Sequence, residues 1–156
     1  MSLFRRFFYI NRVYTMTTEI RSLKNDLIFG DQKELETLSV IKNYWLDDSV
    51  VDTKTKYHTR YCKYDYENDM GTTWELKSRR CTKNQYSTTI IPSHKIRETD
   101  NKQIFLFNFT DCTAYIDYDK EKFSKYNRKM VRCFRAGASS KPVEHIEIPV
   151  CDLTDI

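Results

Sequence analysis

The spacing of apolar residues changes near residue 47, and this change constrains the fold more than any other feature. Residues 31–46 (DQKELETLSVIKNYWL) predict an α-helix, because Leu35, Leu38, Ile41 and Trp45 recur at helical spacing. After a connector at 47–56, strand signals dominate, and strands are expected at 57–66, 72–79, 103–109, 112–118 and 145–150, with a short helix within 80–102. This order predicts an α/β or α+β sandwich around a mixed central sheet.

The length of 156 residues fits one domain, which we place at residues 23–156. With 3 Gly and 3 Pro, long flexible linkers are not expected. Residues 1–22 form a basic and aromatic extension. It is either an amphipathic targeting segment or, the interpretation we favour, an extension that precedes a domain starting at Met16. No apolar run approaches the roughly 20 residues needed to cross a bilayer, so no membrane partner is expected.

Charge and cysteine content narrow the classes of function. The net charge of +4 permits binding to a phosphate backbone without requiring it. The five cysteines are odd in number and include no CxxC pair, which argues against the common zinc sites and against a disulfide framework. We therefore expect ordinary thiols in an intracellular, reducing compartment such as the cytoplasm or nucleus.

An acid-x-Lys tripeptide occurs four times, at Asp31–Lys33, Asp52–Lys54, Glu75–Lys77 and Asp100–Lys102. The Glu75–Lys77 copy alone falls within an expected strand. Side chains alternate along a strand, so Glu75 and Lys77 should share one face, while Trp74 and Leu76 point into a core on the other.

A hairpin folded about Met70 would place Asp65 directly opposite Glu75. Opposed residues of an antiparallel pair share a face with Cβ atoms about 5 Å apart, so two carboxylates would repel each other there. A divalent cation relieves that repulsion, and carboxylate oxygens suit Mg²⁺ or Mn²⁺. Lys77 could then orient the attacking water or stabilise charge on a phosphate.

These segments resemble the PD-(D/E)xK (restriction-endonuclease-like) nuclease superfamily, and particularly small proteins of that type from large DNA viruses. The resemblance covers roughly residues 27–156. It rests on Tyr64-Asp65-Tyr66, on Trp74-Glu75-Leu76-Lys77-Ser78-Arg79, on Tyr86-Ser87-Thr88-Thr89 with Lys95 beyond it, and on Gly30 with Glu34. One departure is Tyr64, where the family nominally has proline.

The resemblance implies an αβββαβ core, with a mixed central sheet flanked by helices. It implies a Mg²⁺- or Mn²⁺-dependent deoxyribonuclease that hydrolyses phosphodiester bonds. Asp65, Glu75, Lys77 and Glu34 would be the catalytic residues, with Asp65 and Glu75 as the metal ligands. DNA would be the partner, with RNA still open and a homodimer a common arrangement among such nucleases. The protein would act in the cytoplasm, the nucleus or a viral factory, or be packaged in a virus particle.

Plainer interpretations remain for each of these residues. Asp65, Glu75 and Lys77 could form a surface charge group, and Glu34 could be a capping-box residue behind an Asp31 N-cap. Arg79, Arg80, Lys83 and Lys95 are candidate nucleic-acid contacts or simply solvated cations, as is the basic stretch at 120–135. A Cys–His or Ser–His nucleophile has no local signature. The alternative function is a non-catalytic nucleic-acid-binding or virion-assembly protein with the same fold.

Overall fold

The computed structural model describes residues 23–132 and 141–156. The extension at 1–22 and part of the basic stretch, residues 133–135, lie outside these ranges. In chain order the helices, strands and 3₁₀ turns are α1 (Leu23–Trp45), β1 (Val51–Asp52), α2 (Thr53–Tyr57), β2 (Tyr66–Glu67), β3 (Thr73–Ser78), η1 (Lys83–Gln85), β4 (Thr88–Pro92), η2 (Ser93–Lys95), β5 (Gln103–Asn108), β6 (Thr113–Asp117), α3 (Lys120–Ser124), β7 (Arg128–Val131), β8 (Val143–Pro149), η3 (Val150–Asp152) and β9 (Thr154–Asp155).

The strands form two sheets. Six of them lie in the order β1-β2-β3-β5-β6-β9, and the other three in the order β4-β8-β7. Strands β3 and β5 are parallel at the centre of the larger sheet, whereas its other neighbours are antiparallel. The larger sheet is therefore mixed, as the sequence predicts, and the fold is of the mixed α+β class.

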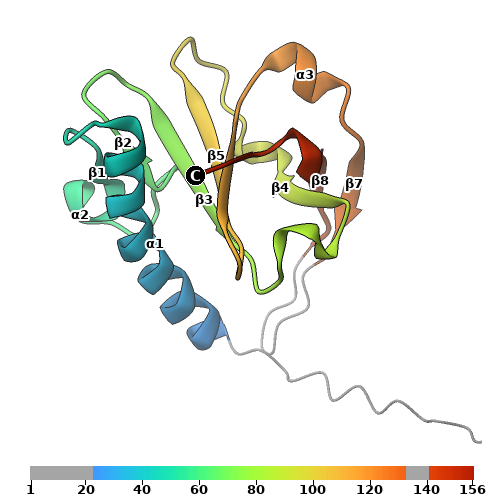
Figure 1. Cartoon of the computed structure of the whole chain (residues 1–156), viewed down its shortest axis with the longest axis horizontal. Coiled ribbons are helices and arrows are strands. Elements are labelled where there is room, and N and C mark those ends of the chain that lie inside the picture. Colours follow the sequence, from blue (N-terminus) through green and yellow to red (C-terminus); the bar gives the residue numbers. More distant parts are fainter. Residues whose placement is uncertain (1–22, 133–140) are drawn as a thin grey trace, which may run out of the picture.

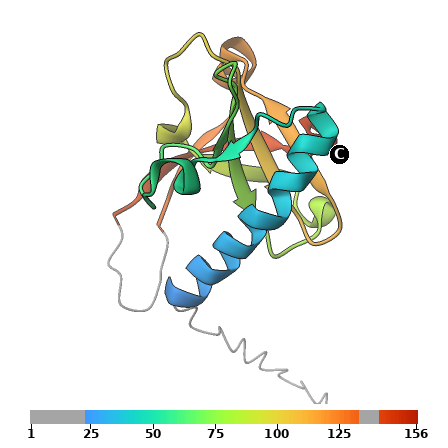
Figure 2. The same ribbon diagram turned by 90° about the vertical axis from the view of Figure 1, so that its left-hand side faces the viewer.

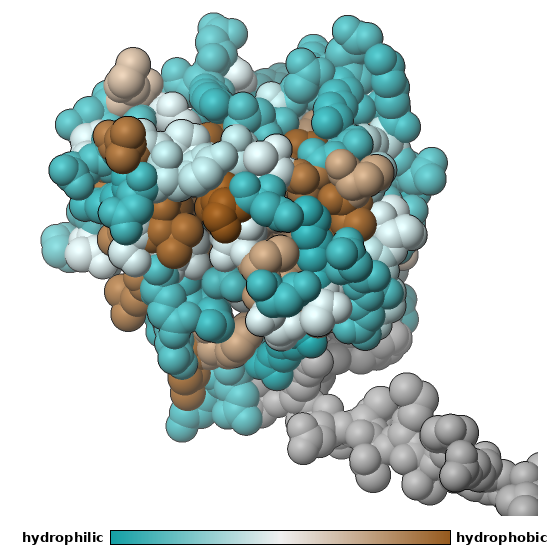
Figure 3. Space-filling view, in the orientation of Figure 1, coloured by the Kyte–Doolittle hydropathy of each residue, from teal (hydrophilic) through white to brown (hydrophobic). Residues whose placement is uncertain are grey.

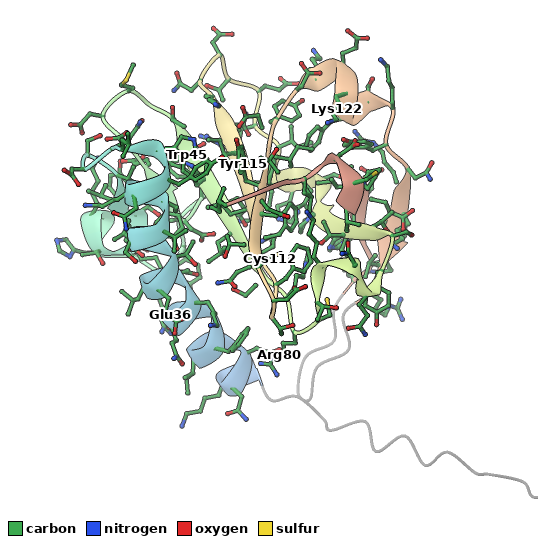
Figure 4. All side chains as sticks on the ribbon, in the orientation of Figure 1. Glu36, Trp45, Arg80, Cys112, Tyr115 and Lys122 are labelled. Atoms are coloured by element: carbon green, nitrogen blue, oxygen red, sulfur yellow. The ribbon has the colours of Figure 1, made fainter. Side chains whose placement is uncertain are left out.

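Helix α1 covers one face of the six-stranded sheet (Figure 2). Alternate residues of β3 and β5 point toward it, among them Trp74 and Leu106, and pack with Ile41 of the helix. At the C-terminal end of α1, the ring centroids of Trp45 and Tyr115 lie 5.0 Å apart (Figure 4). This apolar layer fixes how α1 crosses the strands.

The opposite face of the larger sheet packs against the three-stranded sheet (Figure 1). Phe105 and Phe107 of β5 contact a cluster that includes Ile146 and Ile148 of β8 and Phe123 of α3. In the described ranges this second layer is therefore mainly a sheet, whereas flanking helices were expected on both sides.

The first helix begins eight residues before the expected start. Residues 23–30 contain no proline, so the helical hydrogen bonds continue through Gly30, at a cost of about 1 kcal/mol relative to alanine. Asp31 is therefore an interior helical residue, and the N-cap assigned to it is wrong. Leu35 was expected in the buried stripe but is 69% exposed.

The segment from 47 to 66 is the largest error in the expected elements. The expected connector instead contains β1 and most of α2. The Asp52 side chain caps α2 by accepting a hydrogen bond of 2.8 Å from Thr55 N. The helix ends at Tyr57, and His58, which caps it, has a left-handed φ of 52°. Of the residues expected to form a strand at 57–66, Tyr66 alone belongs to one.

The later strands follow the sequence pattern more closely. Strand β3 and the β5–β6 hairpin lie where expected. The segment 80–102 forms β4 and two 3₁₀ turns instead of a short α-helix. The last expected strand is β8, but it belongs to the second sheet, and β9 follows it.

The surface and the cysteines add little information about the function. Hydrophobic side chains appear on the face in Figure 3 as separate patches among hydrophilic ones. No helix in the described ranges is long and apolar enough to cross a membrane. Four cysteines lie in those ranges, Cys62, Cys81, Cys112 and Cys151, and all four are free thiols.

Candidate active site

Strand β3 presents Glu75 and Lys77 on the face turned away from α1. Their parallel partners on β5 are Phe105 and Phe107, which belong to the cluster between the two sheets, whereas Trp74 belongs to the cluster under α1. The predicted alternation is therefore present. Glu75 is 5% exposed, and Lys77 Nζ lies 2.5 Å from Glu75 Oε1.

Asp65 reaches this strand from the preceding segment. The β2–β3 ladder pairs Tyr66 with Trp74, so the hairpin is centred on position 70 as predicted. The ladder ends at Tyr66, and Asp65 is held instead by its own backbone and side-chain contacts. Asp65 N donates to the Trp74 carbonyl at 3.0 Å, and Asp65 Oδ2 accepts from Leu76 N at 2.7 Å.

The segment before β2 is fixed by the start of α2. Thr53 N donates to the Asp65 carbonyl at 2.9 Å, and Thr53 Oγ1 donates to the Tyr64 carbonyl at 2.6 Å. Thr53 is fully buried, so these bonds are shielded from water. They hold the backbone of Asp65 in place although it lies beyond the strand.

The electrostatic environment of Asp65 shows that three acids converge. Burial raises the pKa of Asp65 to about 7, and the charges of Glu75 and Glu34 add to the rise. The Leu76 N–H and the Lys77 ammonium oppose it. A carboxyl group that titrates near neutral pH in a cluster of acids is a common property of catalytic and metal-binding sites.

Glu34 reaches the cluster from α1. Its own carbonyl accepts a hydrogen bond of 2.6 Å from the Tyr66 hydroxyl, which ties the helix to β2. Its carboxylate is 15% exposed and lies 2.6 Å from Lys54 Nζ. Burial raises the pKa of Glu34, and Lys54 partly opposes that rise. The capping-box interpretation of Glu34 is wrong, because the helix begins eleven positions earlier.

Lys95 is a second lysine on Glu75. Its Nζ lies 2.9 Å from Glu75 Oε1 and 3.0 Å from Oε2, and 3.3 Å from the Lys63 carbonyl. Lys95 lies in the turn η2, directly after β4. This turn brings its side chain to Glu75, which is 20 residues earlier in the sequence. Lys95 also lines an open hollow of about 600 Å³ with Lys63, His94 and Arg97.

Sequence reasoning missed Lys54 as a site residue. It belongs to the Asp52–Lys54 tripeptide, which falls in the expected connector. In the structure it lies in the first turn of α2 and bonds to both Asp31, at 3.2 Å, and Glu34. The recurrence of acid-x-Lys was the available signal, but the connector gave no reason to place Lys54 beside Glu34.

The other candidate cations lie outside the acidic cluster. Arg79 donates from Nε to Thr89 Oγ1 at 3.1 Å. Arg80 pairs with Asp26 at 3.2 Å and stacks on Phe29. Lys83 forms an ion pair with Asp155. The three therefore lie beyond the end of β3, away from the acids.

The acids can be compared with the needs of a metal ion. No group of three His, Cys, Asp or Glu side chains within 23–132 and 141–156 is arranged to hold a metal ion by itself. The donor chemistry of Asp65 and Glu75 nevertheless suits a hard cation, because both offer carboxylate oxygens, and burial together with the charge of Glu75 raises the pKa of Asp65. Two carboxylates are a sufficient protein contribution for Mg²⁺, which usually keeps several waters.

Comparison with known proteins adds no further information, since no family model, curated protein or solved structure matches this chain. What the chain does must therefore be inferred from its own residues.

Proposed function

We propose that this chain is a metal-dependent nuclease that hydrolyses phosphodiester bonds of DNA at the cluster formed by Asp65, Glu75, Lys77 and Glu34. One observation supports this most strongly: the carboxylate of Asp65 is fixed on the backbone of Leu76, beside the buried Glu75 and its lysine. Surface charge groups are not expected to be buried in this way, since burial of a charge is costly.

The resemblance to PD-(D/E)xK nucleases gains support from the topology. Helix α1, strands β1 to β3 and the parallel strand β5 follow in the order that the first parts of such a core require. The crossover from β3 to β5 departs from it, because residues 79–102 contain β4 and 3₁₀ turns where that core has an α-helix. The restriction-endonuclease-like fold is therefore part of the proposal.

Each residue would have a definite part in the reaction. Asp65 and Glu75 would hold Mg²⁺ or Mn²⁺, and the bound cation would polarise a phosphoryl oxygen. Lys77 would orient the attacking water or stabilise charge on the phosphate, because its ammonium already lies on Glu75. Glu34 would add negative charge from α1. Lys95, which lines the adjacent hollow, would contact a phosphate there.

A second candidate function is a non-catalytic DNA-binding or assembly module. The observation that favours it is that lysines already neutralise two of the acids, since Lys77 and Lys95 pair with Glu75 and Lys54 pairs with Glu34. A metal ion would have to compete with these ammonium groups.

Calorimetric titration with Mn²⁺ separates the two functions. A nuclease centre should take up Mn²⁺ in the wild type and lose it in Asp65→Asn and Glu75→Gln. An assembly module should show no uptake that depends on these two residues. Cleavage of labelled DNA then tests the chemistry itself, with Glu75→Ala as the inactive variant.

A further inference from the structure

Arg79 is a partly buried cation that has no carboxylate partner among the described residues. It follows β3, where its backbone N–H donates to the Asn108 carbonyl at 2.7 Å. Its guanidinium lies over the Phe107 ring at 5.8 Å and donates to Thr89 Oγ1 and to the Ile90 carbonyl, both neutral acceptors. Among the described residues it forms no ion pair. Burial lowers the pKa of this guanidinium, which nonetheless stays charged at neutral pH.

Two hollows meet at Arg79. One, of about 470 Å³, lies at the ends of β3 and β5 under the first turns of α1, and Lys33 and Arg80 also line it. The other, of about 310 Å³, adjoins β4, and Lys83 and Lys129 also line it. Figure 4 shows Arg80, one of the residues that line the first hollow, beside the N-terminal part of α1.

The charged residues described in the lining of both hollows are all basic. Among the residues that the structure describes, neither lining contains an aspartate or glutamate, and each contains three basic side chains, with Arg79 shared between them. Four of these cations, Lys33, Arg80, Lys83 and Lys129, have carboxylate partners elsewhere. Arg79 therefore leaves the region with an uncompensated positive charge, which attracts anions.

The chemistry of the ligand follows from the guanidinium. Nε and Nη2 are engaged, while Nη1 has no hydrogen-bond partner among the described residues. A planar guanidinium with free N–H groups suits the oxygens of a phosphate. Phe29 and Phe109 line the first hollow and the exposed Tyr86 the second, so aromatic faces lie close to the charge. Cations with aromatic rings are the usual components of sites for nucleic-acid strands.

The position of Arg79 along the chain relates the two hollows to the acidic cluster. Arg79 follows Glu75 and Lys77 with the spacing of a single strand face, roughly 13 Å from Glu75 at about 3.3 Å per residue. On α1, Lys33 lines the first hollow and its neighbour Glu34 reaches the acidic cluster. A strand cut at Glu75 would have a phosphate a few nucleotides away within reach of Arg79, at a rise of about 3.4 Å per nucleotide.

We propose that Arg79 and the two hollows beside it form a phosphate-binding site that holds the backbone of the nucleic-acid strand a few nucleotides from the bond that is cut. The inference rests on the proposed function for the identity of the strand. The binding of a phosphate group at Arg79 does not depend on cleavage.

Binding in the presence of EDTA tests the site without cleavage. The affinity of the full-length protein for labelled single-stranded and duplex oligonucleotides is measured over a series of salt concentrations, for wild type, Arg79→Gln and Arg79→Lys. Each phosphate contact adds about 0.7 to the salt slope for a single strand and about 0.9 for a duplex. Arg79→Gln should reduce the slope by about that amount, and Arg79→Lys should restore most of it.

Lys102→Gln is the matched control, because Lys102 is exposed, pairs with Asp117 and lines neither hollow. It removes the same charge and should leave the slope unchanged. If Arg79→Gln does not fold, Lys129→Gln tests the same hollow from its rim and should lower the affinity in the same assay. Equal slopes and affinities for wild type and the hollow variants would overturn the proposal.

Inorganic phosphate distinguishes the two sources of the ligand. Phosphate that raises the melting temperature of the wild type but not of Arg79→Gln supports the phosphate site. If oligonucleotide binding is then indifferent to Arg79, the part of the proposal that concerns the strand is wrong. A protein that binds oligonucleotides through Arg79 but never cleaves them contradicts the nuclease function and leaves this site intact.

Discussion

The Asp65 carboxylate accepts a hydrogen bond of 2.7 Å from the backbone N–H of Leu76. This bond places the carboxylate of one segment against the strand that bears Glu75 and Lys77. It also orients one oxygen of Asp65, Oδ2, toward the backbone, so that the acid beside Glu75 is held in one position. A fixed pair of like charges is unfavourable unless a cation or a proton is present.

The first prediction concerns the stability of Asp65→Asn. The pKa of Asp65 is about 7 in the folded chain and near the ordinary 3.8 of an aspartate when unfolded, so the folded state binds more protons between these limits. The free energy of unfolding should therefore fall as pH rises through this window. In metal-free buffer at pH 8, Asp65→Asn should melt at least about 3 °C above wild type, since 1 kcal/mol corresponds to roughly 2–4 °C.

The two proteins should melt alike at pH 4, where wild-type Asp65 is largely protonated when folded. Thermal unfolding followed by circular dichroism at both pH values checks this. A variant that is less stable than wild type at pH 8 would show that Asp65 has a structural role.

The second prediction concerns Glu67, an acid that we expect to stabilise the fold, in contrast to Asp65. Glu67 accepts hydrogen bonds from Lys56 Nζ at 2.7 Å, from the Tyr57 hydroxyl at 2.5 Å and from the Tyr64 hydroxyl at 2.6 Å. These donors lower its pKa although burial opposes them. Glu67→Gln should therefore destabilise the fold, by about 1–3 kcal/mol at pH 8.

For Glu67 the sign of the pH dependence is opposite to that of Asp65. A carboxyl group with a lowered folded pKa stabilises the fold above its unfolded pKa, and this contribution is lost as pH falls through the folded pKa. The difference between wild type and Glu67→Gln should shrink on acidification. Urea unfolding at pH 8 and at pH 3 measures it, and a constant difference would mean that the charge of Glu67 is irrelevant.

The third prediction concerns divalent cations. Mn²⁺ at pH 7.5 should raise the melting temperature of wild type, because it binds the folded state and removes the repulsion between Asp65 and Glu75. At 100 times its dissociation constant the gain is about 2.7 kcal/mol, and EDTA should abolish it. Glu75→Gln should lose the shift, and Asp117→Asn, a surface acid paired with Lys102, should keep it. The same shift in Glu75→Gln and wild type would place the cation elsewhere.

The sequence predicts the centre of the site well because the information is local. Alternation over 72–79 separates Glu75 from Trp74, and the turn at Asn68–Gly71 centres the hairpin. Gly71 has a φ of 80°, and its amide donates to the Asn68 carbonyl at 3.1 Å. With that turn fixed, the approach of Asp65 to Glu75 follows from counting residues.

The lysines around the acids could not be placed in this way. Lys54 and Glu34 are 20 residues apart, as are Lys95 and Glu75. Their contacts depend on how α2 and η2 return to the sheet. The second sheet escaped prediction for the same reason, because β4 pairs with β8, and Ile91 lies 55 positions from its partner Ile146. Long-range pairing leaves no periodic signal in either segment.

The early start of α1 has a different cause. Gly30 suggests an interruption and Asp31 a cap, so the local signals favour a helix that begins at 31. The helix continues because the Tyr66 hydroxyl bonds to the Glu34 carbonyl at its middle and Ile41 packs in the core beyond it, and the extra turns follow from propagation of the helix. Here the tertiary contacts outweigh a local signal for a helix start.

Cleavage of labelled single-stranded, duplex and branched DNA tests the central claim most directly. Wild type, Glu75→Ala, Lys77→Ala and the control Asp117→Asn are compared in Mn²⁺ or Mg²⁺ and in EDTA, after circular dichroism has shown that all four are folded. We predict metal-dependent cutting by wild type and the control, and a loss of at least about 100-fold in both site variants. Cutting that survives Glu75→Ala and Lys77→Ala would contradict the assignment of the site, and no cutting of any substrate by folded wild type would contradict the nuclease function.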